Sequence, residues 1–345
     1  MAARSNARSA LSFLSRHLTM QRPRVHHRLP PHCQSRLATS GRPRVHTKPT
    51  RGSIDATGRR RASMDSMLDL TSLPRTQVEA FIHKNSNEFD LLSPAEYYDS
   101  LMAFTLHIRD HDSPFQLSSP THKLPGAPVL HDLGCIVMEA SRGSKSGLAS
   151  VLWFTAASWG FGPSACSLVA ILAAHGEYGK STATAPAERR FRALVKAGDP
   201  VAMAIEGDIL YRQGKYGEAE AILRKVQQKH AADLGNWEPN FRLAFGKTLA
   251  RRDKMNQAIA MLRALADDGY IEADQQLGSA LRSTDPDEAL QYLFKAGCTG
   301  ALHCFEEMAT IELDKAVNAK NSSDAADHRL WAGELARLAD RKAEF

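Results

Sequence analysis

The chain has 345 residues, of which 43% are hydrophobic and 24% are charged. This composition is ordinary for a soluble globular protein and excludes a chain that is disordered throughout. The formal net charge of +6 is unevenly distributed, because residues 1–62 hold 14 of the 44 Lys and Arg but only one of the 38 acids, Asp55. Residues 63–345 therefore carry 30 basic and 37 acidic side chains, a net charge of −7. A body of this charge offers no net attraction to nucleic-acid phosphates, so nucleic acid is not the partner we expect.

The first 62 residues have the composition of a mitochondrial presequence. No acid precedes Asp55, Arg and Ser are frequent, and four apolar residues follow helical spacing: Ala7, Leu11, Leu14 and Leu18. A basic amphipathic helix of this kind suits import receptors and responds to the inner-membrane potential. The competing interpretation is a basic arm that binds RNA.

A processing site is expected where arginine shortly precedes small residues, near Arg36, Leu37 and Ala38. The leader is expected to be disordered, and the mature protein to lie in the mitochondrial matrix or on the matrix face of the inner membrane.

Residues 63–126 are predicted to form N-terminal helices followed by a proline-rich linker. The stretch Arg75–His107 indicates two helices, of which the second begins at a capping box made by Ser93 and Glu96, with Pro94 at the first helical position. Four prolines between residues 110 and 128 predict a loop there.

Residues 147–176 contain no Lys, Arg, Asp or Glu, and the run is long enough to span a bilayer. Gly160, Gly162 and Pro163 interrupt it at the centre, which favours two short buried helices. The alternative is attachment to the inner membrane, with residues 147–176 as a membrane segment or with the protein bound peripherally.

One template recurs five times: alanine, a bulky residue four positions on, and an apolar residue seven positions on, which share one helical face. Successive alanines are 38, 32, 39 and 31 residues apart. The instances begin at Ala149–Trp153, Ala187–Phe191, Ala219–Leu223, Ala258–Leu262 and Ala289–Leu293.

A glycine lies near the middle of the predicted helix before four of these instances: Gly134, Gly207, Gly246 and Gly278. Each costs its helix about 1 kcal/mol relative to alanine, so the recurrence indicates a packing requirement. Gly198, Gly269 and Gly297 follow the second helices and are expected to form left-handed caps.

The segments 194–225 and 271–297 resemble tetratricopeptide repeats, most closely the Sel-one-like subclass, in their small residues, Leu-Gly pair and aromatic or leucine anchors. The resemblance covers residues 127–300 and is weakest in the second unit, whose linker 176–186 is long and polar. It implies an all-α fold, an α-solenoid of about five pairs of antiparallel helices, closed by capping helices in residues 301–345, the last of them polar. It also implies a scaffold that binds partner proteins.

The chain lacks the common catalytic motifs GxSxG, HExxH and strand-linked GxGxxG, and its five cysteines form no CxxC pair. His107 and His111 are spaced for one helical face but have no third ligand in view, so solvated side chains are expected. We therefore expect no enzyme, cofactor or metal site, and buried free cysteines. The leading hypothesis is a mitochondrial adaptor or assembly factor, for a respiratory complex or for mitochondrial gene expression; the alternative is an RNA-binding helical repeat protein acting on mitochondrial transcripts.

Overall fold

The computed structural model describes residues 64–109, 115, 120, 124–230 and 233–340. The predicted presequence, residues 1–62, and its expected processing site lie outside these residues. Every element with defined bounds in the described part is a helix, and no strand occurs there. The helices are α3 (Arg75–Lys84), α4 (Pro94–Arg109), α5 (Ala127–Ala140), α6 (Ser146–Ser158), α7 (Gly162–Ala174), α8 (Ala185–Ala197), α9 (Pro200–Arg212), α10 (Tyr216–His230), the 3-10 helix η3 (Gly235–Trp237), α11 (Glu238–Arg251), α12 (Met255–Asp267), α13 (Ile271–Leu281), α14 (Pro286–Cys298), α15 (His303–Asn318) and α16 (Ser322–Ala339).

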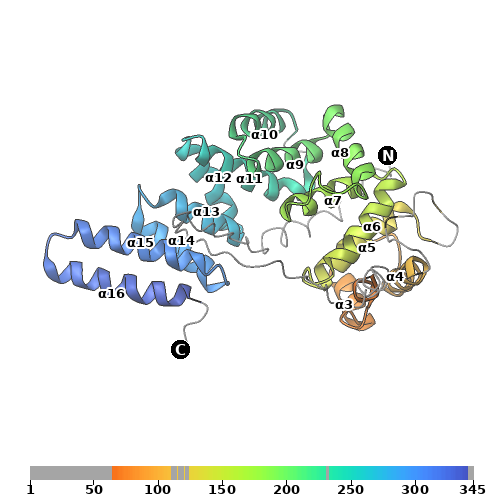
Figure 1. Ribbon diagram of the computed structural model, residues 1–345, viewed down its shortest axis with the longest axis horizontal. Coiled ribbons are helices and arrows are strands. Elements are labelled where there is room, and N and C mark those ends of the chain that lie inside the picture. The colour runs from red at the N-terminus through yellow and green to blue at the C-terminus, as the bar shows by residue number, and fades with distance from the viewer. Residues whose placement is uncertain (1–63, 110–114, 116–119, 121–123, 231–232, 341–345) are drawn as a thin grey trace, which may run out of the picture.

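The helices follow one another along an arc, from α3 and α4 at one end to α15 and α16 at the other (Figure 1). The most extensive contacts join helices adjacent in the chain, including α5 with α6, α9 with α10, α11 with α12, and α13 with α14. The other sizeable contacts reach only the next helix but one, as between α7 and α9 or α9 and α11. The described part of the protein is therefore all-α and built from packed neighbouring helices.

The four mid-helix glycines lie where a paired helix approaches most closely. A Cβ placed on Gly207 of α9 would be 2.5 Å from Leu223 Cγ of α10, and the corresponding separation is 2.8 Å between Gly246 and Leu262. Gly278 meets Leu293 in the same way, at 2.7 Å. Gly134 of α5 faces the indole of Trp153 of α6, again too closely for a Cβ. Each glycine therefore makes room for the bulky residue of the recurring template.

The pair α7 and α8 is assembled differently. No mid-helix glycine faces Phe191, which is nevertheless completely buried. Tyr178, from the linker between the two helices, packs edge-on against Phe191 with ring centroids 6.2 Å apart. The long linker thus supplies part of the packing in this unit.

The expected capping box at the start of α4 is confirmed. The Ser93 backbone N–H donates to Glu96 Oε2 at 2.8 Å, and the Glu96 N–H points back to Ser93 Oγ at 3.4 Å. The loop predicted over residues 110–128 ends earlier than expected, because Pro128 lies in the first turn of α5. Proline is tolerated there because a first-turn N–H has no partner within the helix.

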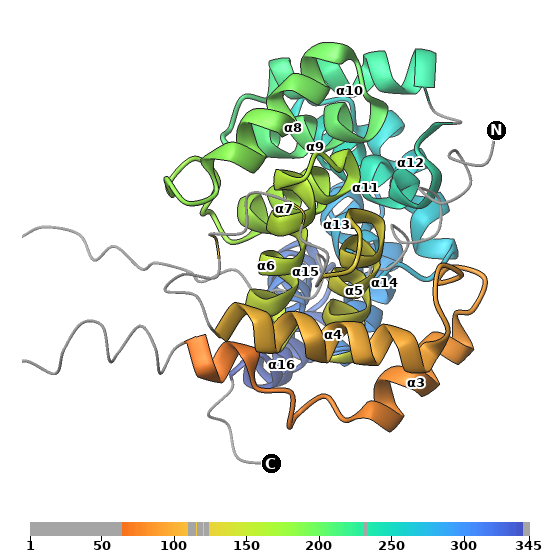
Figure 2. The ribbon, with the colours of Figure 1, turned by 90° about the vertical axis from the view of Figure 1, so that its right-hand side faces the viewer.

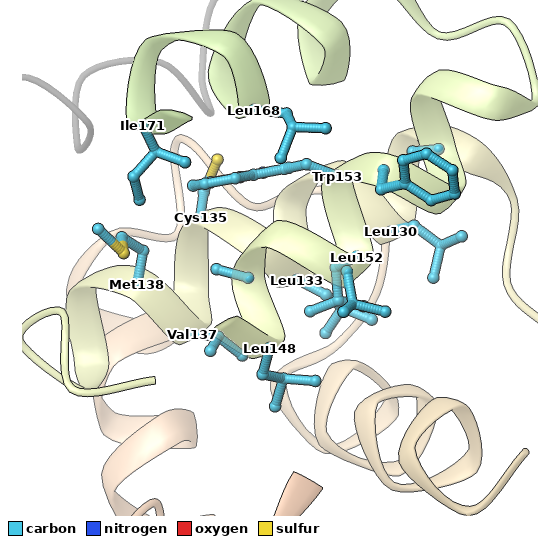
Figure 3. Packing of buried hydrophobic residues seen from close by; sticks show 14 of the residues in the cluster. Leu130, Leu133, Cys135, Val137, Met138, Leu148, Leu152, Trp153, Leu168 and Ile171 are labelled. Atoms are coloured by element: carbon cyan, nitrogen blue, oxygen red, sulfur yellow. The ribbon is translucent and has the colours of Figure 1, made fainter. Parts of the chain in front are cut away.

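The uncharged run forms the two short helices α6 and α7, separated at Gly160, as expected. None of the described helices combines the length and hydrophobicity needed to cross a membrane. Trp153 is completely buried and lies near Cys135 and Leu168 in this part of the core (Figure 3). Nearly every residue from Leu148 to Ala157 is buried, which accounts for the absence of charge.

Two of the three glycines expected to cap helices have left-handed backbones, Gly198 with φ 81° and Gly269 with φ 86°. The third expectation was wrong. Gly297 lies inside α14, where a Cβ would come within 2.8 Å of the Phe305 ring, and the positive φ of 104° belongs to Gly300. Close approach, rather than capping, explains the glycine at 297.

The C-terminal hairpin of α15 and α16 exposes several large apolar side chains on its surface. Val317 is 82% exposed, Leu330 67% and Trp331 63%. Inside the hairpin, His328 Nδ1 and Glu312 Oε2 lie 2.7 Å apart. Exposed apolar side chains therefore lie among the charged residues of both closing helices.

We predict opposite effects of one substitution at two glycines. Gly207→Ala places a methyl group against buried Leu223 and is expected to lower the free energy of unfolding by about 1–3 kcal/mol. Gly217→Ala, at a helical site with open space around it, is the matched control and should raise that free energy by up to about 1 kcal/mol. Urea denaturation of the full chain measures both. Equal stabilisation by the two substitutions would contradict the close packing of α9 and α10.

Candidate functional site

The residues singled out from the repeat template are buried packing residues. The eight template residues are completely buried, at 0% exposure, and three glycines are buried in the partner helices. The template residues are Ala187, Phe191, Ala219, Leu223, Ala258, Leu262, Ala289 and Leu293, and the glycines are Gly207, Gly246 and Gly278. They position the helices but present no group to a ligand. A candidate site has to be sought among their polar neighbours.

A cavity of about 50 Å³ lies between α7, α9, α11 and the start of α13. Figure 2 shows these helices close together across the middle of the molecule. Small and apolar side chains form its walls, among them Ala170, Ala173, Ala204, Ile205 and Phe241. The cavity has room for a water-sized group, since about 10–15 Å³ of such space is enough for one water. We call it the α9–α11 cavity.

Two ion pairs line the α9–α11 cavity. Arg212 Nε donates to Asp208 Oδ2 at 2.6 Å on α9, and Lys247 Nζ of α11 donates to Glu272 Oε1 of α13 at 3.1 Å. The Lys247 ammonium also lies 5.2 Å from the centroid of the Tyr211 ring. Burial lowers the pKa of Lys247, but Glu272 and Asp208 outweigh it, so the pKa lies above its ordinary value. Both cations are therefore charged at neutral pH.

Two hydrogen-bond donors at the same cavity have no acceptor. Trp237 is 2% exposed, and within the described residues neither its Nε1 nor the buried Nδ2 of Asn240 has a hydrogen-bond partner. Trp237 is the N-cap of α11 and Asn240 belongs to its first turn, yet no side chain caps this helix. A buried donor left without an acceptor costs about 1–3 kcal/mol, so these two groups lower the stability of the packing around the start of α11.

A second polar cluster lies wholly inside the core, where α4 and α7 meet α5. His131 Nδ1 is 3.0 Å from Ser164 Oγ and its Nε2 is 3.9 Å from Cys135 Sγ. Next to it, the Tyr97 hydroxyl donates to Asp132 Oδ2 at 2.8 Å. Burial lowers the pKa of His131 to about 3, so the imidazole is neutral. All five side chains are at least 95% buried, which suits structural hydrogen bonding rather than catalysis.

Three of the cysteines in the described residues are buried as expected, whereas Cys298 is exposed. His107 is partly exposed at the end of α4, and His111 lies outside the described residues. Within the described part of the chain, no three His, Cys, Asp or Glu side chains are grouped so as to hold a metal ion.

Sequence reasoning missed the α9–α11 cavity entirely. Its polar residues come from four helices, and no motif links Asp208 with Asn240 or Glu272. The available signal was a tryptophan and a proline, Trp237 and Pro239, at the start of a helix that begins without Ser, Thr, Asp or Asn as its cap.

No protein-family model, no curated protein and no solved structure matches this chain. Its function is therefore argued from its own residues.

Replacing Asp132 tests the buried cluster. Burial, opposed by the Tyr97 hydrogen bond, raises the pKa of Asp132 from 3.8 to about 7. The protonated carboxyl therefore favours folding, and this contribution, complete below about pH 4, is lost as the pH rises through 7. We expect the free energy of unfolding of the wild type, relative to Asp132→Asn, to fall by about 2–3 kcal/mol between about pH 5 and pH 8.

Urea denaturation at the two pH values, with the exposed Asp327→Asn as control, measures this difference. A wild-type advantage over Asp132→Asn that does not change with pH would rule out the raised pKa.

Proposed function

We propose that this protein is an adaptor that binds other proteins, built as an α-solenoid of about five repeated helix pairs. The observation that carries the proposal is the recurring contact between a glycine in one helix and a bulky template residue in the next, made at Gly207, Gly246 and Gly278. Repeated pairs that contact only their neighbours form extended surfaces, which such arrays use to bind partners.

The first helices of successive pairs supply the binding surface in this proposal. Contacts join α7 to α9, α9 to α11 and α11 to α13, so these helices lie next to one another. The α9–α11 cavity opens among them and is lined by charged groups of both signs. An extended segment of a partner crossing these helices would meet apolar walls and fixed polar groups, the combination typical of recognition sites.

The presequence-like leader places this adaptor, in our proposal, in the mitochondrial matrix or on the matrix face of the inner membrane. The support is its composition: 14 basic residues and one acid in residues 1–62. Assembly of a respiratory complex, or support of mitochondrial gene expression, is the role that this location suggests.

Filling the cavity tests the binding surface. Ala173 lines the cavity and is partly exposed, so Ala173→Trp should block it and lower the recovery of specific partners about tenfold or more in affinity purification from mitochondria. Ala221→Trp, at an exposed position of α10, is the matched control and should recover partners as the wild type does.

Circular dichroism and urea denaturation establish that both variants fold. Partners recovered equally by the wild type and Ala173→Trp would place binding elsewhere, and the absence of any partner above background would overturn the adaptor proposal.

The location is tested separately. Residues 1–62 fused to a fluorescent protein should direct it to mitochondria, because their positive charge responds to the membrane potential. Replacing Arg4, Arg8 and Arg16 by Gln should abolish this import while leaving the apolar spacing intact. A cytosolic or nuclear signal from the unaltered fusion would refute the mitochondrial assignment.

A further inference from the structure

We infer that two copies of this chain pair through α16, with the two helices antiparallel and Leu330 of each copy packed against Gly333 of the other. The inference goes beyond the proposed function, because it concerns a different surface, at the end of the helix array, and a second copy of this chain as the partner. It stands whether or not the protein is an adaptor.

Gly333 differs from the other glycines in the interiors of the described helices. Beyond the first turns of these helices, the other five glycines lie where a bulky side chain of a neighbouring helix leaves no room for a Cβ: Gly134, Gly207, Gly246, Gly278 and Gly297. Gly333 lies well inside the eighteen-residue helix α16, and a Cβ placed on it would meet nothing within 4 Å. Glycine weakens a helix interior relative to alanine, so its presence here indicates a close contact that the single chain lacks.

Gly333 belongs to an exposed stripe along α16. Its four members are four, three and four positions apart, a spacing that places them on one side of the helix: Ala326, Leu330, Gly333 and Arg337. All four are exposed, and the large apolar side chain of Leu330 is 67% exposed. Among the described helices, α16 packs extensively against α15 alone, at the end of the arc (Figure 1). The stripe lies outside the face that α16 buries on α15, so no described helix covers it.

The stripe complements itself when two copies meet in antiparallel orientation. In a pair of antiparallel helices related by a two-fold axis, the numbers of residues that lie opposite each other have a constant sum. An axis midway between Leu330 and Gly333 places each leucine opposite the glycine of the other copy, so the same contact forms twice. This contact already joins helix pairs within the chain, as between Leu223 and Gly207. A parallel pair would instead place leucine against leucine and leave both glycines unfilled.

The charges of α16 favour the same register. Ala326 then lies opposite Arg337 of the second copy, and the residue next to Ala326 is the exposed Asp327. Arg337 Nη2 already lies 2.8 Å from Glu334 Oε2 of its own helix. In the antiparallel pair each Arg337 therefore lies between Glu334 of its own copy and Asp327 of the other, whereas a parallel pair would bring two arginines together. Exposed ion pairs add little affinity, so these contacts mainly set the orientation of the pair.

Sedimentation of the full chain tests the pairing. Only one helix of each copy takes part, so the interface is small for a specific complex, and we expect a dissociation constant of about 1–100 µM. Sedimentation equilibrium at chain concentrations from about 1 to about 500 µM should therefore follow a monomer–dimer equilibrium.

Two substitutions of adjacent residues distinguish the stripe from nonspecific association. Leu330→Asp places a carboxylate against the second copy and should weaken the dimer about a hundredfold or more. Trp331→Asp is the matched control, because Trp331 is 63% exposed but lies outside the stripe, and it should leave the dissociation constant unchanged. Circular dichroism of the dilute chains establishes that both variants fold.

Two further changes test the register. Gly333→Ala should weaken the dimer about tenfold or more, because its methyl group meets Leu330 of the second copy. The same substitution should make the dilute single chain more resistant to urea, since the site there has open space. Asp327→Arg places two arginines together and should weaken the dimer about threefold or more, and adding Arg337→Asp should restore the lost affinity.

A chain that stays monomeric over the whole concentration range overturns the inference, as does equal weakening by Leu330→Asp and Trp331→Asp. A dimer that is as tight in Gly333→Ala as in the wild type also overturns it, because the glycine then receives no side chain. A charge exchange that restores no affinity overturns the antiparallel register. Because partner recovery by Ala173→Trp is measured separately, failure here leaves the proposed adaptor function standing.

Discussion

The structure depends on the close approach of paired helices at positions where one helix has a glycine. Where Leu223, Leu262 and Leu293 meet their partner helices, a Cβ would lie 2.5–2.8 Å from leucine carbons. Real Cβ atoms do not come so near, so each of these three helix pairs requires glycine at one place. The helix loses intrinsic stability through that glycine, and burial of the leucine opposite, at 0% exposure, more than offsets the loss. Helix register and spacing follow from these contacts.

The part of the fold set by local periodicity could be predicted from the sequence. Alanine, bulky and apolar residues at i, i+4 and i+7 mark one helical face, and all five instances lie on α6, α8, α10, α12 and α14. The helix start at Ser93 and the interruption at Gly160 could also be predicted, because capping and turn residues act over a few positions. The role of Gly297 was predicted wrongly. The sequence alone does not distinguish a glycine that caps a helix from one that makes room for a close contact near the helix end.

The candidate site could not be predicted, because nothing local connects its residues. Asp208 and Arg212 are one turn apart, but Lys247, Glu272 and Trp237 come from other helices and meet them only through tertiary packing. The buried polar cluster around His131 was not predicted for a different reason. Its residues lie in helices whose sequence pattern is dominated by apolar residues. Sequence periodicity identifies which faces are buried and says little about the polar groups that burial brings together.

The confinement of helix contacts to near neighbours also bears on how the chain folds. Such contacts are close in sequence, so little loop-closure entropy opposes their formation and folding can begin at any helix pair. Among the described helices, none from one end of the chain packs against the other end. We therefore expect local opening to spread inward from a terminus, and backbone amide protons of α15 and α16 to exchange with solvent before those of α9 to α12.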